Sequence, residues 1–433
     1  MKFFSTRDGA HKVSIEEALL AGLAPDGGLY VPELFPKINI EKAPLATHRE
    51  FATYVLAPFF SGSSLERHLS NICEKAFSFE IPIKKLSPTL SVLELTHGPT
   101  CAFKDVGAQF LAATVPFLSV GANRPRLVLV ATSGDTGGAV GCAFSGQPNT
   151  RVVILYPNGG ISERQERQLT CWQENVKAYA VEGSFDDCQK LVKESFLDAD
   201  LKSQWQLLSA NSISLGRLLP QMIYYAFAAA KHAKENKSSE TTVSALNFVI
   251  PTGNMGNALA AIWARKCGFP IGKIGLALNA NRAIVDFFQT HNWSPQKSVA
   301  TLANAMDVGN ASNMERLRSL LTIDPTVENI ISAISVSDEE IRSTIRAVFQ
   351  QHQYISCPHT ATAFFAAQKW GWKNAVVVAT ADPAKFESIV GPIIGESVPT
   401  PEALLQILDR ALRRVKIAPN RQDLIGVLNA KNS

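Results

Sequence analysis

The sequence predicts an α/β fold, in which helices cover both faces of parallel sheets. Short runs rich in valine, leucine and isoleucine recur along the chain, and such fully apolar strands are typical of parallel sheets. Each run ends in turn-forming residues and is followed by another element, often a helix-compatible stretch. With 433 residues, the chain is long enough for two or three domains around substantial cores.

The expected strand–helix units begin at residue 126. The predicted strands are RLVLVA (126–131), RVVILYP (151–157), VKAYAV (176–181), LNFVI (246–250), KIGLAL (273–278) and NAVVVAT (374–380). The helix-compatible stretches between them include AVGCAFSG, SERQERQLTCWQE, DDCQKLVKESFLD and ALAAIWARKCG. Strands that alternate with helices in this way indicate a parallel sheet.

Three polar segments directly follow predicted strands: SGDTGG (133–138), PTGNMGN (251–257) and the region of Thr380. Because ligands bind at the carboxyl ends of strands in such sheets, we expect these segments to share one site. SGDTGG offers amides and hydroxyls at a helix N-terminus, whose dipole favours an anion by ~0.3–1 kcal/mol. In PTGNMGN, Gly253 and Gly256 permit close backbone approach, so its amides can also donate to an anion. PTGNMGN is neither a nucleotide P-loop nor a GxGxxG fingerprint, which disfavours NAD.

Lys104, in LELTHGPTCAFKD, gives these loops a chemical context. The three residues before it are apolar, and Asp105 follows as a possible orienting group. A lysine in a desolvated setting can lose its proton and form a Schiff base with a carbonyl cofactor. Together with two anion-binding loops, it predicts a cofactor with an aldehyde and a phosphate, which is pyridoxal 5'-phosphate. The simpler alternatives are a surface lysine and, for SGDTGG, a tight turn with a helix cap.

The composition argues against several classes of protein. Lys+Arg 42 against Asp+Glu 38 gives a net charge of +4 without a run of like charges, which disfavours nucleic acid as the main partner. The seven cysteines are scattered without a CxxC pair, so we expect no disulfide framework and no metal site, and a reducing compartment fits best. Neither a secretory apolar core nor an 18-residue apolar stretch is present. We therefore expect a cytoplasmic protein that acts without a membrane.

Further segments extend the pattern along the whole chain. They are FFSTRDG, DGGLYVP, HGPTCAFKD, ATSGDTGG, ISERQERQ, GSFDDCQ, SANSISLGRLLPQ, PTGNMGN, NAMDVGNASNMERL, PHTATA and ATADPAKF. In this order they resemble the threonine synthases of the shorter, microbial and fungal type, pyridoxal-phosphate enzymes of the tryptophan-synthase-like fold (fold type II). The resemblance implies an N-terminal domain (1–90), a large cofactor-binding domain (91–118 and 205–433) and a small mobile domain (119–204).

The resemblance also implies a reaction and a substrate. The expected reaction converts O-phospho-L-homoserine and water into L-threonine and phosphate by γ-elimination and β-addition. One alternative is a phospholyase of the same lineage, which would give 2-oxobutyrate, ammonia and phosphate. Another is a pyridoxal-phosphate carrier without enzymatic activity. The expected assembly is a monomer or a homodimer.

The resemblance assigns roles residue by residue. Lys104 would form the Schiff base and serve as the mobile base. The cofactor-binding residues would be Asp135 near the ring hydroxyl, Thr380 at the pyridine nitrogen, and Gly253, Asn254, Met255, Gly256 and Asn257 around the phosphate. The substrate-binding residues would be Ser133 and Thr136 for the carboxylate, with Asn211, Ser212 and Arg217. Asn313 and Arg316 are weaker candidates for the same task as Arg217.

Some positions depart from the family pattern. Met255 and Asn257 replace commoner aromatic and acidic residues, and we expect phosphate binding by backbone amides to survive both changes. Asp382 stands where histidine is common, and Cys357 replaces a common acidic residue. For His97 and His359 a capping or core role is expected, with His97 the more probable of the two to touch the site.

Overall fold

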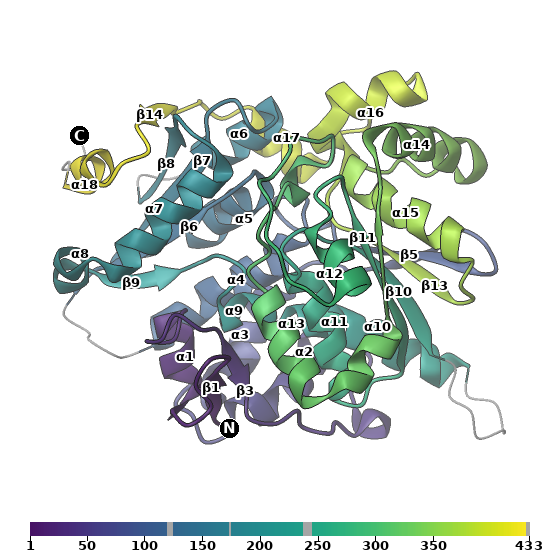
Figure 1. Ribbon diagram of the computed structural model, residues 1–433, viewed down its shortest axis with the longest axis horizontal. Coiled ribbons are helices and arrows are strands. Elements are labelled where there is room, and N and C mark those ends of the chain that lie inside the picture. Colours follow the sequence, from purple (N-terminus) through teal and green to yellow (C-terminus); the bar gives the residue numbers. More distant parts are fainter. Residues whose placement is uncertain (119–123, 173–174, 237–244, 430–433) are drawn as a thin grey trace.

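The computed structural model describes residues 1–118, 124–172, 175–236 and 245–429. Three sheets organise these residues, and two of them are large and mostly parallel. Figure 1 shows the two large sheets side by side, with the N-terminal elements below them. Among the described residues, no helix has the length and apolar character needed to cross a membrane.

The larger sheet has six strands in the order β12-β11-β10-β13-β5-β4. Their bounds are β4 Ile83–Lys85, β5 Leu90–Glu94, β10 Leu246–Pro251, β11 Ile271–Leu278, β12 Ile331–Ser335 and β13 Ala375–Ala379. All neighbours are parallel except β4, which pairs with β5 in the antiparallel sense. The central strands β10 and β13 are buried almost throughout, as their continuous apolar runs predict.

The second large sheet has five parallel strands in the order β14-β8-β7-β6-β9. Their bounds are β6 Arg126–Ala131, β7 Thr150–Pro157, β8 Val176–Val181, β9 Gln206–Ser209 and β14 Val415–Ile417. The strands predicted from the apolar runs in this part of the chain are confirmed as β6, β7 and β8. Two strands, β9 and β14, lie outside the range 119–204 that we expect for a small domain.

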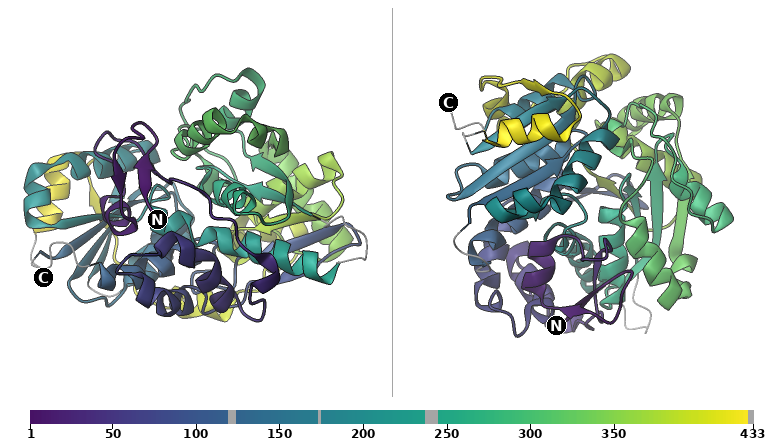
Figure 2. Two further views of the ribbon diagram at one scale, coloured as in Figure 1. Left: turned by 90° about the horizontal axis from the view of Figure 1, so that it is seen from below. Right: turned by 60° about the vertical axis from the view of Figure 1, so that its left-hand side comes forward.

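The N-terminal region forms a small antiparallel sheet and three helices. The elements are β1 Phe3–Ser5, β2 Lys12–Val13, α1 Ile15–Ala21, β3 Tyr30–Pro32, α2 His48–Phe60 and α3 Leu69–Ala76. Helix α1 begins at a capping box of Ser14 and Glu17 and buries its apolar face. It packs against β9, while α2 packs against α10 and α3 against α4, so this region contacts the five-stranded sheet and the helices around the site (Figure 2).

The remaining helices cover the two large sheets. Those nearest the site are α4 Lys104–Thr114, α5 Asp135–Phe144, α6 Glu163–Thr170, α9 Leu215–Leu218, α10 Gln221–Glu235 and α11 Gly256–Lys266. The others are α7 Phe185–Leu197, α8 Ala199–Gln204, α12 Ala283–Thr290, α13 Met314–Ile323, α14 Asp338–His352, α15 Pro358–Trp370, α16 Glu387–Ile394, α17 Glu402–Leu408 and α18 Arg421–Asn429. Short 3-10 turns include η4 Asn304–Met306 and η6 Pro383–Phe386.

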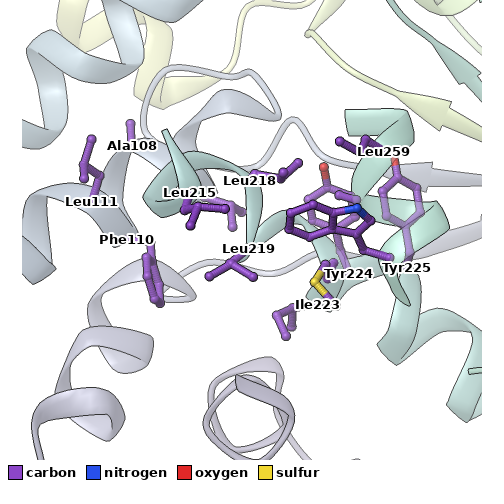
Figure 3. Close-up of a cluster of buried hydrophobic side chains, with 14 of the residues drawn as sticks. Ala108, Phe110, Leu111, Leu215, Leu218, Leu219, Ile223, Tyr224, Tyr225 and Leu259 are labelled. Atoms are coloured by element: carbon purple, nitrogen blue, oxygen red, sulfur yellow. The ribbon is translucent and has the colours of Figure 1, made fainter. Parts of the chain in front are cut away.

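A buried apolar cluster holds the helices of the site together. Figure 3 shows side chains of α4, α9, α10 and α11 packed against one another, among them Leu111, Leu215, Ile223 and Leu259. Close packing requires Gly107 on α4, because a Cβ there would lie 2.8 Å from the Arg217 carbonyl oxygen. The cluster therefore fixes α4, which begins at Lys104, relative to α11, which begins at the second glycine-rich loop.

Candidate active site

A cavity lies where strands of both large sheets end. Its lining includes the predicted site residues Lys104, Ser133, Asp135, Thr136, Asn211, Ser212, Arg217, Gly253, Asn254, Gly256, Asn257 and Thr380. Met255 is absent from the lining because its side chain is fully buried in the core. Residues far apart in sequence are thus brought together at the carboxyl ends of the strands, as the strand–loop pattern predicts.

The Lys104 amine lies in this cavity at the start of α4. Nζ makes no hydrogen bond with any described residue and lies 4.9 Å from the centroid of the Phe103 ring. Burial lowers the pKa of Lys104 to about 8, Asp135 opposes this shift, and Arg217 and Lys385 add to it. The neighbouring Asp105 accepts hydrogen bonds from the Thr100 backbone nitrogen (2.9 Å) and Oγ1 (2.5 Å), so it braces the turn before the lysine.

The loop after β10, Gly253 to Asn257, presents a row of backbone amides. None of these five amides donates a hydrogen bond to another described residue. The Asn257 side chain closes the loop, since Oδ1 accepts from Thr252 Oγ1 (2.7 Å) and Nδ2 donates to the Pro251 carbonyl (2.9 Å). Met255 has a φ of 62°, a left-handed conformation that costs a non-glycine residue roughly 1–2 kcal/mol. A strained loop with free donors is suited to an anion.

Gly253 is needed for the shape of this loop. A Cβ at this position would lie 2.8 Å from the Met306 Cα, which is a backbone atom that cannot easily move. Asn254 Nδ2 donates to Ser212 Oγ (2.6 Å), and Asn254 Oδ1 accepts from the Ser312 backbone nitrogen (2.5 Å). The side chains of Asn254 and Ser212 therefore hold the loop in place, while the backbone faces the cavity.

The loop after β6 has a different construction. Thr132 Oγ1 accepts hydrogen bonds from the backbone nitrogens of Gly134 and Gly137, both at 3.0 Å, which shapes the turn into α5. The amides and hydroxyls of Ser133 and Thr136 make no hydrogen bond with another described residue. They lie at the N-terminus of α5 and line the cavity, so they are available to a carboxylate or a phosphate.

Asp135 carries a negative charge into this wall of the cavity. Its Oδ1 lies 2.7 Å from Lys385 Nζ and accepts a hydrogen bond from Gln165 Nε2 at 3.1 Å. Burial alone would raise the pKa of Asp135, but the Lys385 and Lys104 ammonium groups outweigh burial and hold this pKa well below its usual value. The sequence did not identify Lys385 as a site residue, although Lys385 lies in the segment ATADPAKF that carries the family resemblance.

Arg217 contributes a buried positive charge. Its side chain is 3% exposed, and Nη1 donates to the Ala210 carbonyl at 2.6 Å. Nε has no hydrogen-bond partner among the described residues. Burial lowers the pKa of Arg217 to about 10, which Asp105 opposes, so the guanidinium stays charged. Arg217 lines the cavity, so its charged guanidinium can attract an anionic ligand there.

Two other predicted polar side chains have defined settings. The Asn211 side chain pairs with the backbone of Ala131, accepting from its nitrogen (3.3 Å) and donating to its carbonyl (2.8 Å), and so joins β6 to the loop after β9. Thr380 is 5% exposed, and its carbonyl accepts from the Phe103 nitrogen at 2.9 Å. Its hydroxyl has no partner among the described residues and is available to a ligand.

Arg316 and Asn313, the weaker candidates for an anion site, support the cavity without lining it. Arg316 Nε donates to the Tyr30 carbonyl (2.9 Å) and Nη1 to Asn313 Oδ1 (2.7 Å). Asn313 Nδ2 in turn donates to the Asn254 carbonyl at 3.1 Å. The expectation of ligand binding was therefore wrong, because both side chains are used to connect the N-terminal region to the loop after β10.

The expectation that His97 is more probable than His359 to touch the site is also wrong. His359 lines the cavity, and its Nε2 accepts from the Ala305 nitrogen at 3.0 Å. Burial lowers the pKa of His359 to about 4, so the ring is neutral. His97 lies outside the cavity lining and pairs with Glu94 at 2.9 Å.

Two of the departures from the family pattern, Asp382 and Cys357, are helix caps. Asp382 accepts a hydrogen bond from the Ala384 nitrogen at 2.8 Å at the start of η6. Cys357 Sγ accepts from the Thr360 nitrogen at 3.4 Å at the start of α15. Neither residue lines the cavity, so the changes do not alter its wall. Among the described residues, no group of three or more histidines, cysteines or carboxylates could hold a metal ion.

Comparisons with known proteins agree with this geometry. The family described as "Pyridoxal-phosphate dependent enzyme" matches residues 82–381, and that described as "Threonine synthase N terminus" matches residues 2–77. The threonine synthase of Serratia marcescens is 37% identical over 409 residues, which cover 93% of each chain. The chain belongs to the threonine synthase family. The crystal structure of the Escherichia coli threonine synthase superposes with a TM-score of 0.91 at 33% identity, over 99% of both chains.

These findings confirm the predicted fold class, enzyme class and cofactor. A pyridoxal-phosphate-bound threonine synthase from Brucella melitensis has a TM-score of 0.88 at 32% identity, covering 99% of this chain and 98% of the other. The residues of the cavity fit this cofactor on their own chemistry. The free Lys104 amine can meet an aldehyde, and the unpartnered amides after β10 can meet a phosphate.

Proposed function

We propose that the protein is a threonine synthase that converts O-phospho-L-homoserine and water into L-threonine and phosphate. One observation supports this most: a single cavity joins the Lys104 amine to three separate groups of anion-binding donors. These are the amides after β10, the amides and hydroxyls after β6, and the Arg217 guanidinium. Cofactor and substrate together carry three anionic groups, namely the cofactor phosphate, the substrate carboxylate and the substrate phosphate.

The cofactor belongs on the side of the six-stranded sheet. In this proposal the backbone of Gly253, Asn254, Met255, Gly256 and Asn257 holds its phosphate, and the Thr380 hydroxyl meets its ring nitrogen. When bound, pyridoxal phosphate supplies an aldehyde that condenses with an amine and a ring that accepts electrons from the adjacent carbon. A neutral hydroxyl at the ring nitrogen, instead of a carboxylate, would moderate that electron withdrawal.

Lys104 has the chemistry of a proton carrier. After the substrate amine has taken its place on the cofactor, the free Lys104 amine would move protons at Cα and Cβ of the substrate. A pKa of about 8 lets this amine both accept and release protons near neutral pH. Phosphate would then leave from Cγ, a proton would return to Cγ, the hydroxyl of water would add at Cβ and a proton would return to Cα, so the sum of the steps is the stated reaction.

The two ends of the substrate require different partners. Ser133 and Thr136, at the N-terminus of α5, suit the carboxylate, and the helix dipole adds to their hydrogen bonds. Arg217 is then left for the substrate phosphate, which a guanidinium can bind through two donors. Asn211 and Ser212, which also line the cavity, remain proposed substrate-binding residues.

We also propose a division of the chain into three domains. We expect residues 119–204 to act as a small mobile domain that brings the loop after β6 toward the cofactor, held by residues 91–118 and 205–433. Residues 1–90 would form the N-terminal domain. The proposed assembly is a monomer or a homodimer. A cytoplasmic location remains part of the proposal.

The direct test is to incubate the purified holoenzyme with O-phospho-L-homoserine and to quantify threonine, 2-oxobutyrate and phosphate. We expect threonine and phosphate in equal amounts, with 2-oxobutyrate near background. Lys104→Ala serves as the control that removes the proposed base. Equal amounts of 2-oxobutyrate and phosphate would instead establish the phospholyase activity, and a cofactor-loaded protein that releases no phosphate would establish the carrier.

A further inference from the structure

A fully buried lysine stands behind the wall of the cavity. The side chain of Lys385 is 0% exposed and belongs to η6, which follows the strand β13 of the six-stranded sheet. Its partner Asp135 is the first residue of α5, which follows β6 of the five-stranded sheet. The ion pair therefore connects the two large sheets at the site, with Nζ and Oδ1 2.7 Å apart.

The contacts of this pair leave one carboxylate oxygen for the cavity. Lys385 Nζ also donates to the Thr100 carbonyl at 3.1 Å, and Gln165 Nε2 donates to the same Asp135 Oδ1 at 3.1 Å. Asn304 Nδ2 holds Gln165 from the other side, at 3.1 Å from Oε1. Asp135 Oδ2 makes no hydrogen bond with a described residue, and Asp135 lines the cavity. One oxygen is anchored, and the other is free for a ligand.

The surroundings of Asp135 make its charge depend on neighbouring cations. The titratable groups that act on it come from the elements packed around it: Lys104 of α4, His359 of α15, Lys385 of η6, and the thiols of Cys101 and Cys357. Of these, His359 is neutral, and Lys104 loses its charge whenever it releases its proton. Lys385 is the basic group in direct contact with Asp135, at 2.7 Å. A buried carboxylate without such a partner takes up a proton.

We propose that Lys385 is a positioning residue of the active site, which keeps Asp135 a carboxylate with one oxygen directed into the cavity beside Lys104. The proposal rests on the proposed function, in which Lys104 picks up and releases protons. A carboxylate close to that amine stabilises its ammonium form, but it would compete for the same proton if its own affinity were high. Pairing with Lys385 removes the competition, so the proton stays on Lys104.

The test compares Lys385→Met, Asp135→Asn and the double variant as holoenzymes, with Lys369→Met on the exposed part of α15 as the control lysine. The measurements are the pH profile of kcat and the pH titration of the cofactor absorbance. In Lys385→Met we expect the acidic limb of both profiles to move up by about one pH unit or more, a tenfold change in proton affinity. KM should change less than kcat below pH 7, and kcat should recover toward higher pH.

The double variant tests whether Lys385 affects the pH profile through Asp135. If Lys385 acts through Asp135, the double variant has the profile of Asp135→Asn, and the shifted limb disappears. A purely structural role predicts an equal loss at every pH and additive losses in the double variant, which would overturn the proposal. The double variant buries neither charge, so it keeps the test valid should Lys385→Met fold poorly.

A second readout does not need the reaction. The thermal midpoint of the cofactor-free protein should fall between pH 5 and pH 8 in Lys385→Met relative to the unmodified chain, because Asp135 would then have to lose a proton in the folded state. In the unmodified chain the pKa of Asp135 is held low, so its contribution is already complete above pH 5. Should the unmodified enzyme form no threonine, the proposed function fails, while this measurement still decides the role of Lys385.

Discussion

The two glycine-rich loops of the site share one local design and differ in how their polar groups are used. Each follows a buried parallel strand and leads into a helix, and each leaves backbone amides free at the cavity. The loop after β10 is held by neutral side chains: Asn257 pairs with Thr252 and Pro251 within the segment, and Asn254 donates to Ser212. The loop after β6 contains a carboxylate whose partners, Lys385 and Gln165, come from other elements.

This difference indicates what each loop does. The loop after β10 is held from the N-terminal region through Arg316 and Asn313, and the side chains that hydrogen-bond to the loop itself are uncharged. Such a cradle is suited to an anion that stays bound, and the proposed function assigns the cofactor phosphate to it. The loop after β6 is tied across the two sheets by an ion pair, so its electrostatics can respond to a ligand that arrives and leaves.

The largest expected effect comes from removing the amine between the loops. Lys104→Ala should lower turnover by roughly 10³-fold or more, because the proposed Schiff base and proton carrier are both lost. The fold should persist, and the Schiff-base absorbance should disappear while the phosphate cradle still binds the cofactor weakly. Absorbance spectra, circular dichroism and threonine formation measure these outcomes. Normal turnover in this variant would refute the assignment of Lys104.

The support of the cradle by the N-terminal region can be broken at Arg316. Arg316→Met removes the donors to two carbonyls and to Asn313, and we expect the free energy of unfolding to fall by about 3 kcal/mol. Cofactor affinity should fall with it, whereas KM for the substrate at saturating cofactor should hardly change. Denaturant unfolding and cofactor titration measure the two effects, and Arg318→Met, exposed on the same helix, is the matched control. Equal losses in cofactor and substrate binding would show that the loops are not independent.

Adding one methyl group to each loop tests which ligand that loop binds. Gly253→Ala places a Cβ 2.8 Å from the Met306 Cα, and Gly134→Ala places one 2.4 Å from Gln165 Nε2, at a φ of 131°. A strained position costs of order 1–3 kcal/mol, so we expect losses of about 10- to 100-fold. Gly253→Ala should weaken cofactor binding, and Gly134→Ala should raise KM for the substrate. Gly426→Ala, where a Cβ meets nothing within 4 Å, is the control, and a reversed pattern would exchange the proposed ligands of the loops.

The comparison also shows how far the sequence alone leads. The apolar runs predicted the strands, and the polar segments after them predicted that SGDTGG, PTGNMGN and the region of Thr380 meet, since strand polarity places their ends at one edge. Lys104 was joined to them by its chemistry and by the family resemblance. Those inferences needed only local patterns. Local patterns could not predict the Asp135–Lys385 ion pair, because the two residues are 250 positions apart in the sequence and come into contact only in the folded chain.

The supporting residues were harder to assign for a related reason. Arg316 satisfies its guanidinium with the carbonyls of Tyr30 and Ile213, and a backbone carbonyl leaves no mark in the sequence. An arginine next to a binding motif therefore looks like an anion ligand until its acceptors are known. His97 was preferred over His359 because it is close to Lys104 in sequence, but a turn between them directs His97 toward Glu94.

The smallest expected effect concerns the pH at which Lys104 becomes reactive. Because burial lowers the pKa of this amine to about 8, the rate of pyridoxal phosphate incorporation into the cofactor-free protein should rise with pH and level off above about 8.5. An unperturbed lysine, with a pKa near 10.4, would keep gaining about tenfold per pH unit through that range. Asp135→Asn removes the anion that opposes the shift, so its midpoint should lie below that of the unmodified chain. Stopped-flow absorbance measures the rate, and an identical midpoint in both proteins would mean that the charge in the loop after β6 does not reach the amine.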